Sequence, residues 1–198
     1  MNFDTKYLIR WGIPGWIMVM VLLPYFIVIY FDFLSSHVST ASDLLAIGAV
    51  LTVLGVPLGY LLNQIHHSLF WVLPKCWKGT WSTYFDEEIK VDEYFDKDES
   101  HKDKRERYRY LLSRKHELGG VVVSLGISGF VILLRCIYVL IFKNLQLWEI
   151  FYFVIVLTLF LILWLSRNYS SENIEKYHAY YLKQSQSRGI LFIEKEDG

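Results

Sequence analysis

Residues 121–165 read VVVSLGISGFVILLRCIYVLIF, then KNLQ, then LWEIFYFVIVLTLFLILWL, two apolar runs joined by a short turn. Each run is long enough to cross the ~30 Å hydrocarbon core of a bilayer as a helix, which takes about 20 residues. Open strands would leave backbone groups unpaired in lipid, so helices are the expected structure. The sequence therefore predicts two transmembrane helices, over residues 121–142 and 147–165.

Two further apolar runs, Trp16–Leu34 and Leu44–Leu62, precede this pair. Pro24 and Pro57 lie inside them, and each proline is expected to kink its helix and free a carbonyl. A cleavable signal peptide is the alternative for the first run, because basic residues precede it and a sequence resembling a cleavage site follows. The run is longer than the roughly 7–15 apolar residues of such peptides, so we expect it to remain.

Basic residues are distributed unevenly among the segments that flank these four runs. Two precede the first run, eleven lie in residues 75–115, five follow Ser166, and only Lys143 falls on the opposite side. Lys and Arg accumulate on the cytoplasmic side of membrane proteins. Both termini and the central segment are therefore expected in the cytoplasm, with the chain in the cell inner (plasma) membrane.

The sequence thus predicts an all-α integral membrane protein with four transmembrane helices, a short cytoplasmic insert and a cytoplasmic C-terminal helix. Its composition agrees, since 54% of the residues are hydrophobic and the charged ones are concentrated outside the four runs. The expected divisions are residues 1–74 with the first two helices, 75–118 as the charged insert, 119–166 with the last two helices, and 167–198 as the C-terminal helix and tail.

The insert and the tail carry local patterns of their own. Residues 86–99 are acidic with interleaved aromatics and predict a short hairpin or loop. Residues 101–117 are mostly good helix formers and predict a basic helix that ends at the glycine pair 119–120, where it meets the third run. In the tail, residues 168–187 keep a helical pattern, and residues 189–193 predict a short extended end.

Small residues recur at helical spacing in the second and third runs. Such stripes let helix backbones approach closely where lipid supplies no hydrophobic drive for association. They indicate packing either within one four-helix chain or between subunits around an axis, and a transport function would require such subunits. The stripes consist of Gly48, Thr52, Gly55 and Gly59 in the second run and of Gly120, Ser124 and Ser128 in the third.

Arg135 is the one basic side chain deep inside an apolar run. An Arg at that depth costs about 2.5–3.5 kcal/mol on insertion scales and usually faces water or a partner. Three interpretations stay open, which are an ion pair with Glu149, snorkelling to the outer headgroups, and a ring of charge that lines a pore. The candidates for lining a pore are Arg135, Glu149, Ser128, Ser124 and Thr52.

The basic part of the insert holds the candidate ligand-binding residues. Such a run of positive charge can contact anionic headgroups, bind an anionic cytoplasmic ligand such as a nucleotide or oligonucleotide, or remain a solvated face. The candidates are Arg105, Arg107, Arg109 and Arg114.

Three motifs resemble parts of catalytic or metal-binding sites, but none of them has the other residues that such a site needs. Residues 126–129 match the GxSG of rhomboid proteases, whose catalytic His on another span has no counterpart in the four runs. Arg109 and His116 resemble the R-x4-6-H spacing of HEPN ribonucleases, which arises easily by chance in so basic a helix. His66 and His67 are adjacent, point to different faces of a helix and cannot both ligate one metal from it. We therefore expect no enzyme, no metal site and no cofactor.

A small four-span chain with a short cytoplasmic insert, and with RWGIPGW at residues 10–16, resembles the membrane effectors of bacterial antiphage defence. The Hailong effectors, which are oligomeric channels gated by nucleic-acid oligomers, and the membrane accessory proteins of type VI-B CRISPR loci are of this kind. The resemblance implies a homo-oligomer that depolarises or permeabilises the inner membrane on a cytoplasmic trigger. The alternative is a non-catalytic accessory subunit that binds a partner protein through the insert and tail. Membrane lipids are partners in either case.

Overall fold

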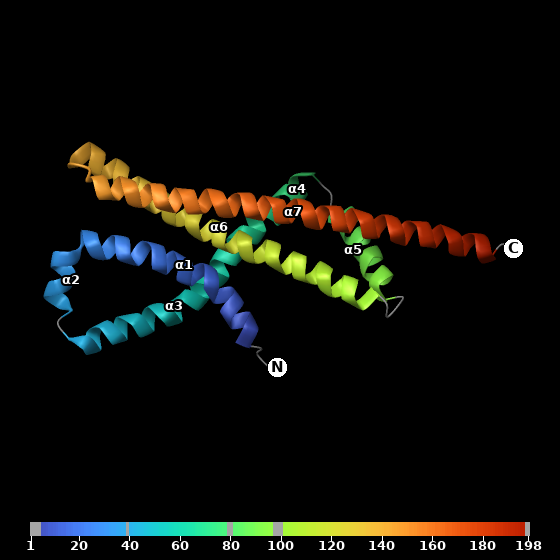
Figure 1. The fold of residues 1–198 in the computed structure, drawn as a ribbon, viewed down its shortest axis with the longest axis horizontal. Coiled ribbons are helices and arrows are strands. Elements are labelled where there is room, and N and C mark those ends of the chain that lie inside the picture. The colour runs from blue at the N-terminus through green and yellow to red at the C-terminus, as the bar shows by residue number, and fades with distance from the viewer. Residues whose placement is uncertain (1–4, 39, 79–80, 97–100, 197–198) are drawn as a thin grey trace. The chain divides into compact units, whose positions relative to one another are not determined.

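The structure, a computed structural model, is built of helices (Figure 1). It describes residues 5–38, 40–78, 81–96 and 101–196, and these ranges contain no strand. Within them, four helices are long and apolar enough to cross a membrane, which confirms the all-helical class and the four apolar runs. These helices cover Trp11–Ile29, Ala41–Trp77, Lys102–Phe142 and Leu147–Ser185.

The elements form two compact units. Unit 1 comprises residues 1–67 and 117–165, and unit 2 comprises residues 68–116 and 166–198. Helices α6 and α7 contribute residues to both units. In chain order the elements are α1 (Thr5–Ile29), α2 (Phe31–His37), α3 (Ala41–His67), the π-helical turn η1 (Ser68–Val72), α4 (Leu73–Lys78), α5 (Trp81–Asp96), α6 (Lys102–Phe142) and α7 (Leu147–Glu196).

Two predicted boundaries are wrong because local packing and turns are invisible to a count of apolar residues. The first predicted span continues to Leu34, but α1 ends at Ile29 and a turn at Tyr30 separates it from α2. The glycine pair 119–120 was expected to end a helix, yet α6 runs through it. Neither glycine adopts the left-handed conformation that ends helices.

Two other local predictions are also wrong. The acidic segment expected as a hairpin or loop is helical as far as Asp96, within α5, and its last residues, 97–99, lie outside the described ranges. Val91, Tyr94 and Phe95 are buried there at the three- and four-residue spacing of a helix, which explains the difference. The expected extended end at residues 189–193 is part of α7.

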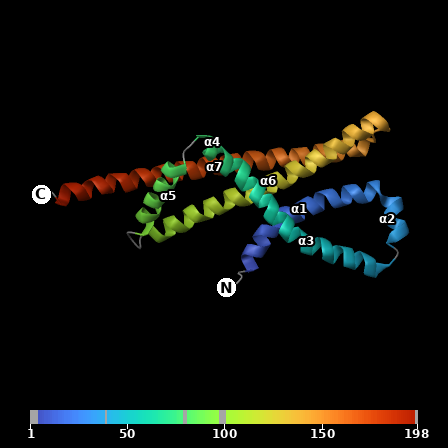
Figure 2. The same cartoon turned by 180° about the vertical axis from the view of Figure 1, so that it is seen from behind.

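Unit 1 is organised around a crossing of α1 and α3, seen from both sides in Figures 1 and 2. A Cβ at Gly15 would collide with the backbone of Gly55 and lie 2.5 Å from the Gly59 nitrogen. Only glycine allows this approach, which brings one backbone directly onto the other. Beside the crossing, the Trp16 indole nitrogen donates a hydrogen bond to the Thr52 carbonyl oxygen at 2.9 Å.

Unit 2 has a core rich in aromatic side chains. In it, α5 packs against the parts of α6 and α7 that belong to this unit (Figures 1 and 2). The His101 ring stacks on Tyr94 with 4.4 Å between ring centroids, and its Nδ1 lies 3.0 Å from the Tyr94 carbonyl oxygen. The buried core consists of Val91, Tyr94, Phe95, Tyr108, Ile174 and Tyr181.

Candidate functional site

Polar side chains line one buried face of α6 within unit 1. Ser124 and Ser128 are both fully buried, at 0% exposed, and Ile132 and Cys136 continue the same face at four-residue spacing. This face is turned toward α1, because Ser124 Oγ donates a hydrogen bond to the Pro14 carbonyl oxygen at 2.7 Å. The two serines predicted as pore-lining candidates therefore lie in the interior of a single chain.

A second group of polar side chains gathers where α1, α6 and α7 meet. Tyr25 of α1 is fully buried, and Glu149 of α7 is only 3% exposed. Arg135 of α6 is half-buried, and both Arg135 and Glu149 lie close enough to Tyr25 to interact with it electrostatically. The fold thus brings together two of the predicted pore-lining residues and a tyrosine from a helix distant in sequence.

Several polar atoms in these two groups have no hydrogen-bond partner in the described part of the chain. They are Ser128 Oγ, Arg135 Nε and Glu149 Oε2. An unpaired buried polar atom costs about 1–3 kcal/mol, and more when it is charged. Native structures contain few such atoms, and a functional role is one explanation for them. We call Ser124, Ser128, Arg135, Tyr25 and Glu149 together the polar stripe.

The polar stripe extends along a large part of the apolar section of α6. The rise from Ser124 to Arg135 is about 16 Å at 1.5 Å per residue. This is about half of the ~30 Å hydrocarbon thickness that a spanning helix must cross.

Aromatic side chains of α7 hold α1 against this stripe. The Tyr25 ring centroid lies 5.6 Å from that of Trp148 and 5.4 Å from that of Tyr152. The Tyr152 hydroxyl donates a hydrogen bond to the Val21 carbonyl oxygen at 2.7 Å. That carbonyl lies in the turn before Pro24, where a proline ring weakens the helix's own hydrogen bonds.

The predicted helix-packing glycines have different surroundings. Gly55 and Gly59 pack against α1 of the same chain, and Gly120 lies close to Asn63 of α3. A Cβ at Gly48 would meet nothing within 4 Å, and Thr52 is exposed with its hydroxyl bonded to the Gly48 carbonyl at 2.8 Å. Packing between subunits at these last two positions stays a prediction.

The four arginines predicted to bind a ligand are not equivalent. Arg105 forms an ion pair with Asp96. The Arg107 guanidinium lies 5.2 Å from the centroid of a tyrosine ring of α7. Arg109 and Arg114 are exposed. Their contact with an anionic ligand stays a prediction.

The four predicted apolar runs contain no histidine, but the membrane-length helices of the structure are longer than these runs. The second such helix extends beyond Leu62 and includes His66. Its ring lies beside Gly119, which is about 13 Å along α6 from Ser128. These two residues therefore do not form a Ser–His pair. Among the described residues, no group of three His, Cys, Asp or Glu side chains could hold a metal ion.

Sequence reasoning missed Tyr25 as a member of the polar stripe. Its hydroxyl lies in the middle of an apolar run beside Pro24, which is a signal that could have been used. Its neighbours on α6 and α7, in contrast, depend on which helix faces meet, and one sequence does not contain that information.

Comparison of the chain with known protein families, with curated proteins and with solved structures gave no match.

Proposed function

We propose that the protein is an oligomeric membrane channel or pore-type effector. The observation that carries this proposal is the polar stripe, in which hydroxyl, carboxylate and guanidinium groups are buried within membrane-length helices, most of them with an unpartnered polar atom. Ionisable groups inside membrane spans face a bundle interior or a water-filled cavity, and they commonly mark ion pathways.

The chemistry of the stripe suits the passage of hydrated ions. Ser124 and Ser128 supply hydroxyl oxygens along α6, and Arg135 and Glu149 supply charge at one end. Because α1 covers this face, conduction requires α1 to move away from α6 and α7. Four helices leave little interior within one chain, so conduction and assembly of several copies belong to the same proposal.

The proposal includes an orientation and a biological setting. The distribution of basic residues supports cytoplasmic termini, a cytoplasmic insert and a location in the inner membrane. Opening on a cytoplasmic trigger would depolarise the cell, in the manner that the resemblance to antiphage effectors implies.

A second candidate is a non-catalytic accessory subunit that binds a partner protein. The core of unit 2 favours it, because Val91, Tyr94 and Phe95 of α5 pack with aromatic residues of α6 and α7 into a folded body. Such a body can present a defined surface to a partner.

Conductance measurements on purified protein in liposomes test the channel. Ser128→Ala removes a hydroxyl of the polar stripe without adding volume at this fully buried position, so it should lower single-channel conductance. Glu149→Gln should shift selectivity away from cations, because it removes the carboxylate. Thr158→Val is the matched control, since the Thr158 side chain is exposed and its hydroxyl bonds only its own helix, at 2.8 Å from the Val154 oxygen.

Two results would overturn the proposal. One is wild-type protein that is electrically silent in liposomes and does not depolarise cells that overproduce it, which would favour the accessory subunit. The other is that Ser128→Ala and Glu149→Gln change the conductance no more than Thr158→Val does.

A further inference from the structure

Unit 2 contains a lysine whose ammonium group is enclosed by aromatic rings. The Lys75 nitrogen lies 2.6 Å from the ring centroid of Tyr84, 4.6 Å from that of Trp71 and 5.7 Å from that of Trp81. The nitrogen is buried and has no hydrogen-bond partner among the residues that the structure describes. These rings offer the ammonium group cation–π contact, and its three N–H groups are unused.

A second buried cation of unit 2 is Arg167 of α7, which is only 8% exposed. Its guanidinium carbon lies 4.1 Å above the Phe70 ring. One terminal nitrogen donates a hydrogen bond to Asn168 at 3.3 Å, while Nε has no partner in the described part of the chain. Like Lys75, this group is held by an aromatic ring and keeps a free donor.

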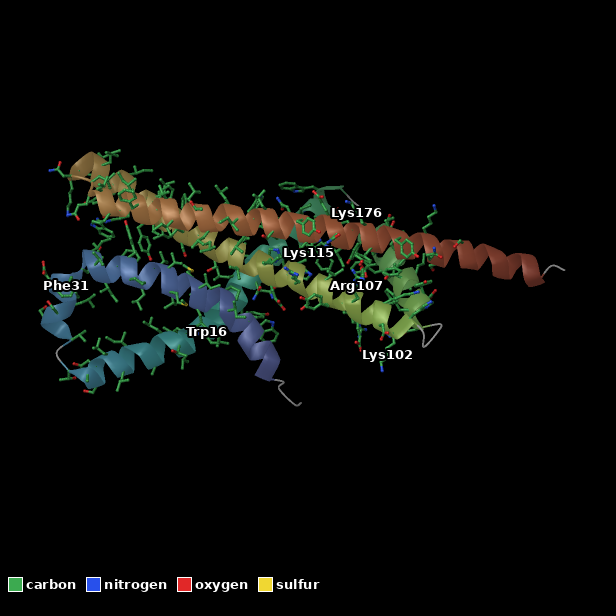
Figure 3. The ribbon with its side chains drawn as sticks, in the orientation of Figure 1. Trp16, Phe31, Lys102, Arg107, Lys115 and Lys176 are labelled. Carbon is green, nitrogen blue, oxygen red and sulfur yellow. The ribbon has the colours of Figure 1, made fainter. Side chains whose placement is uncertain are left out.

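The third positive group is Lys115, on the part of α6 that runs beside α7 (Figure 3). The Trp71 ring, which lies 4.6 Å from the Lys75 nitrogen, is also 6.0 Å from the ring of His116, the residue after Lys115. The ring under Arg167 belongs to the residue before Trp71, so the three positive groups share one region of unit 2.

Burial lowers the pKa of each of the three cations, that of Lys75 to about 8. The charge of Glu88 opposes this shift at Lys75, and that of Glu175 opposes it at the other two cations. Each cation therefore has a carboxylate within electrostatic range.

The nearby carboxylates do not neutralise this cluster by direct contact. Glu88 accepts hydrogen bonds from Tyr84 at 2.9 Å and Tyr108 at 3.4 Å, and His178 lies 3.6 Å from the same oxygen. Glu175 accepts a hydrogen bond from a serine of its own helix at 3.1 Å. Within the described ranges, no carboxylate oxygen lies within 4.0 Å of any of the three cations.

We propose that Lys75, Lys115 and Arg167 form a binding site for a phosphate group. Phosphate oxygens accept hydrogen bonds from ammonium and guanidinium donors, and such charge-assisted bonds are about twice as strong as neutral ones. A bound phosphate would bring negative charge into direct contact with the cluster and would use the free donors of Lys75 and Arg167. The site does not depend on the channel proposal, because every group in it belongs to unit 2.

The phosphate has two possible sources, a phospholipid headgroup or a soluble phosphate compound. Arg167 follows the fourth apolar run by two residues, and Lys75 lies two residues before the end of the second membrane-length helix at Trp77. Both are therefore near the depth at which lipid phosphates lie. A soluble phosphate compound would bind the same donors, so the experiment separates the two sources.

Protein in phosphatidylcholine nanodiscs provides one arm, in which sodium pyrophosphate binding is measured by isothermal titration calorimetry. In the other arm, native mass spectrometry of detergent-solubilised protein measures retention of phosphatidylglycerol relative to phosphatidylcholine. Preferential lipid retention assigns the site to a lipid phosphate, and pyrophosphate binding assigns it to a soluble compound. Either result supports the site.

The decisive comparison uses variants with equal loss of charge. Lys115→Gln/Arg167→Gln should weaken binding of the retained probe by about tenfold or more for each group removed. Lys102→Gln/Lys176→Gln removes two exposed charges from the same helices and should leave binding unchanged. If the first variant does not fold, Lys75→Gln at the half-buried position makes the same comparison, and Lys115→Arg should bind as the wild type does. Equal affinity of wild type and cluster variants, or no binding of either probe, overturns the proposal.

Discussion

A single methyl group added at Gly59 should loosen the crossing of α1 and α3. Its Cβ would collide with the Trp11 carbonyl oxygen and lie 2.9 Å from the Gly15 nitrogen, whereas ordinary van der Waals contact begins at 3.4 Å. The backbones must therefore move apart by at least about 0.5 Å, which gives up close contacts along the crossing. Forced overpacking of this kind costs about 1–3 kcal/mol, so we expect Gly59→Ala to be destabilised by that amount.

Gly48→Ala is the matched control on the same helix, because a Cβ there meets nothing within 4 Å. Alanine favours helix over glycine, so this variant should equal the wild type or exceed it by up to about 1 kcal/mol. Circular dichroism during unfolding in mixed micelles of increasing SDS content measures both variants. Because Gly59 packs within its own chain, the loss should appear in a monomer as well as in any oligomer. Equal stability of Gly59→Ala and Gly48→Ala would refute the backbone contact.

Other parts of the molecule give three shorter predictions. Tyr152→Phe removes the 2.7 Å hydrogen bond to the Val21 carbonyl and should cost about 0.6 kcal/mol in the same unfolding assay; an unchanged midpoint would contradict it. Burial lowers the pKa of Lys75 in the folded chain to about 8, so above this pH the unfolded chain binds more protons than the folded one. The stability of the folded chain should therefore rise with pH from about 8 toward 10. A melting temperature of the wild type that falls relative to that of Lys75→Gln over this pH range would count against this. In an otherwise cysteine-free chain, an impermeant maleimide added to intact cells should label Ser36→Cys and not Ser185→Cys, and the reverse pattern would exclude the proposed orientation.

The apolar runs predicted much of unit 1 because membrane-length helices depend on composition over about 20 residues. The third run ends at Phe142 and the fourth begins at Leu147, as α6 and α7 do. The end of the first run was misplaced because Phe31 and Phe33 are as apolar as the helix before them. A count of apolar residues therefore does not detect the turn at Tyr30.

Unit 2 was harder to predict because its helices are indicated by the spacing of their apolar residues and not by their overall composition. In α5, acidic residues surround Val91, Tyr94 and Phe95, so charge suggested a loop while the positions of three apolar residues favoured a helix. The tertiary contacts of unit 2 could not be predicted from the sequence. Nothing in the sequence says that Lys75 meets Tyr84, or that Arg167 meets Phe70.

The candidate site in unit 1 was predictable only in part. The four-residue spacing of Ser124 and Ser128 places them on one face of a helix, whatever that face contacts. That the face meets Pro14 and lies near Tyr25 is a property of the assembled chain. The pairing of α1 with α6 decides which polar groups are buried together.

The crossing of α1 and α3 also has a consequence for biosynthesis. Both helices precede α6 and α7 in the chain, and they touch through the backbone at Gly15 and Gly59. Because membrane helices insert first and associate afterwards, this pair can assemble during translation, before the second half of the protein has been made. The nascent α6 then docks onto a surface that already exists, with Asn63 in place to receive Gly120. Early association of this kind shortens the time for which the N-terminal half is exposed to quality-control proteases.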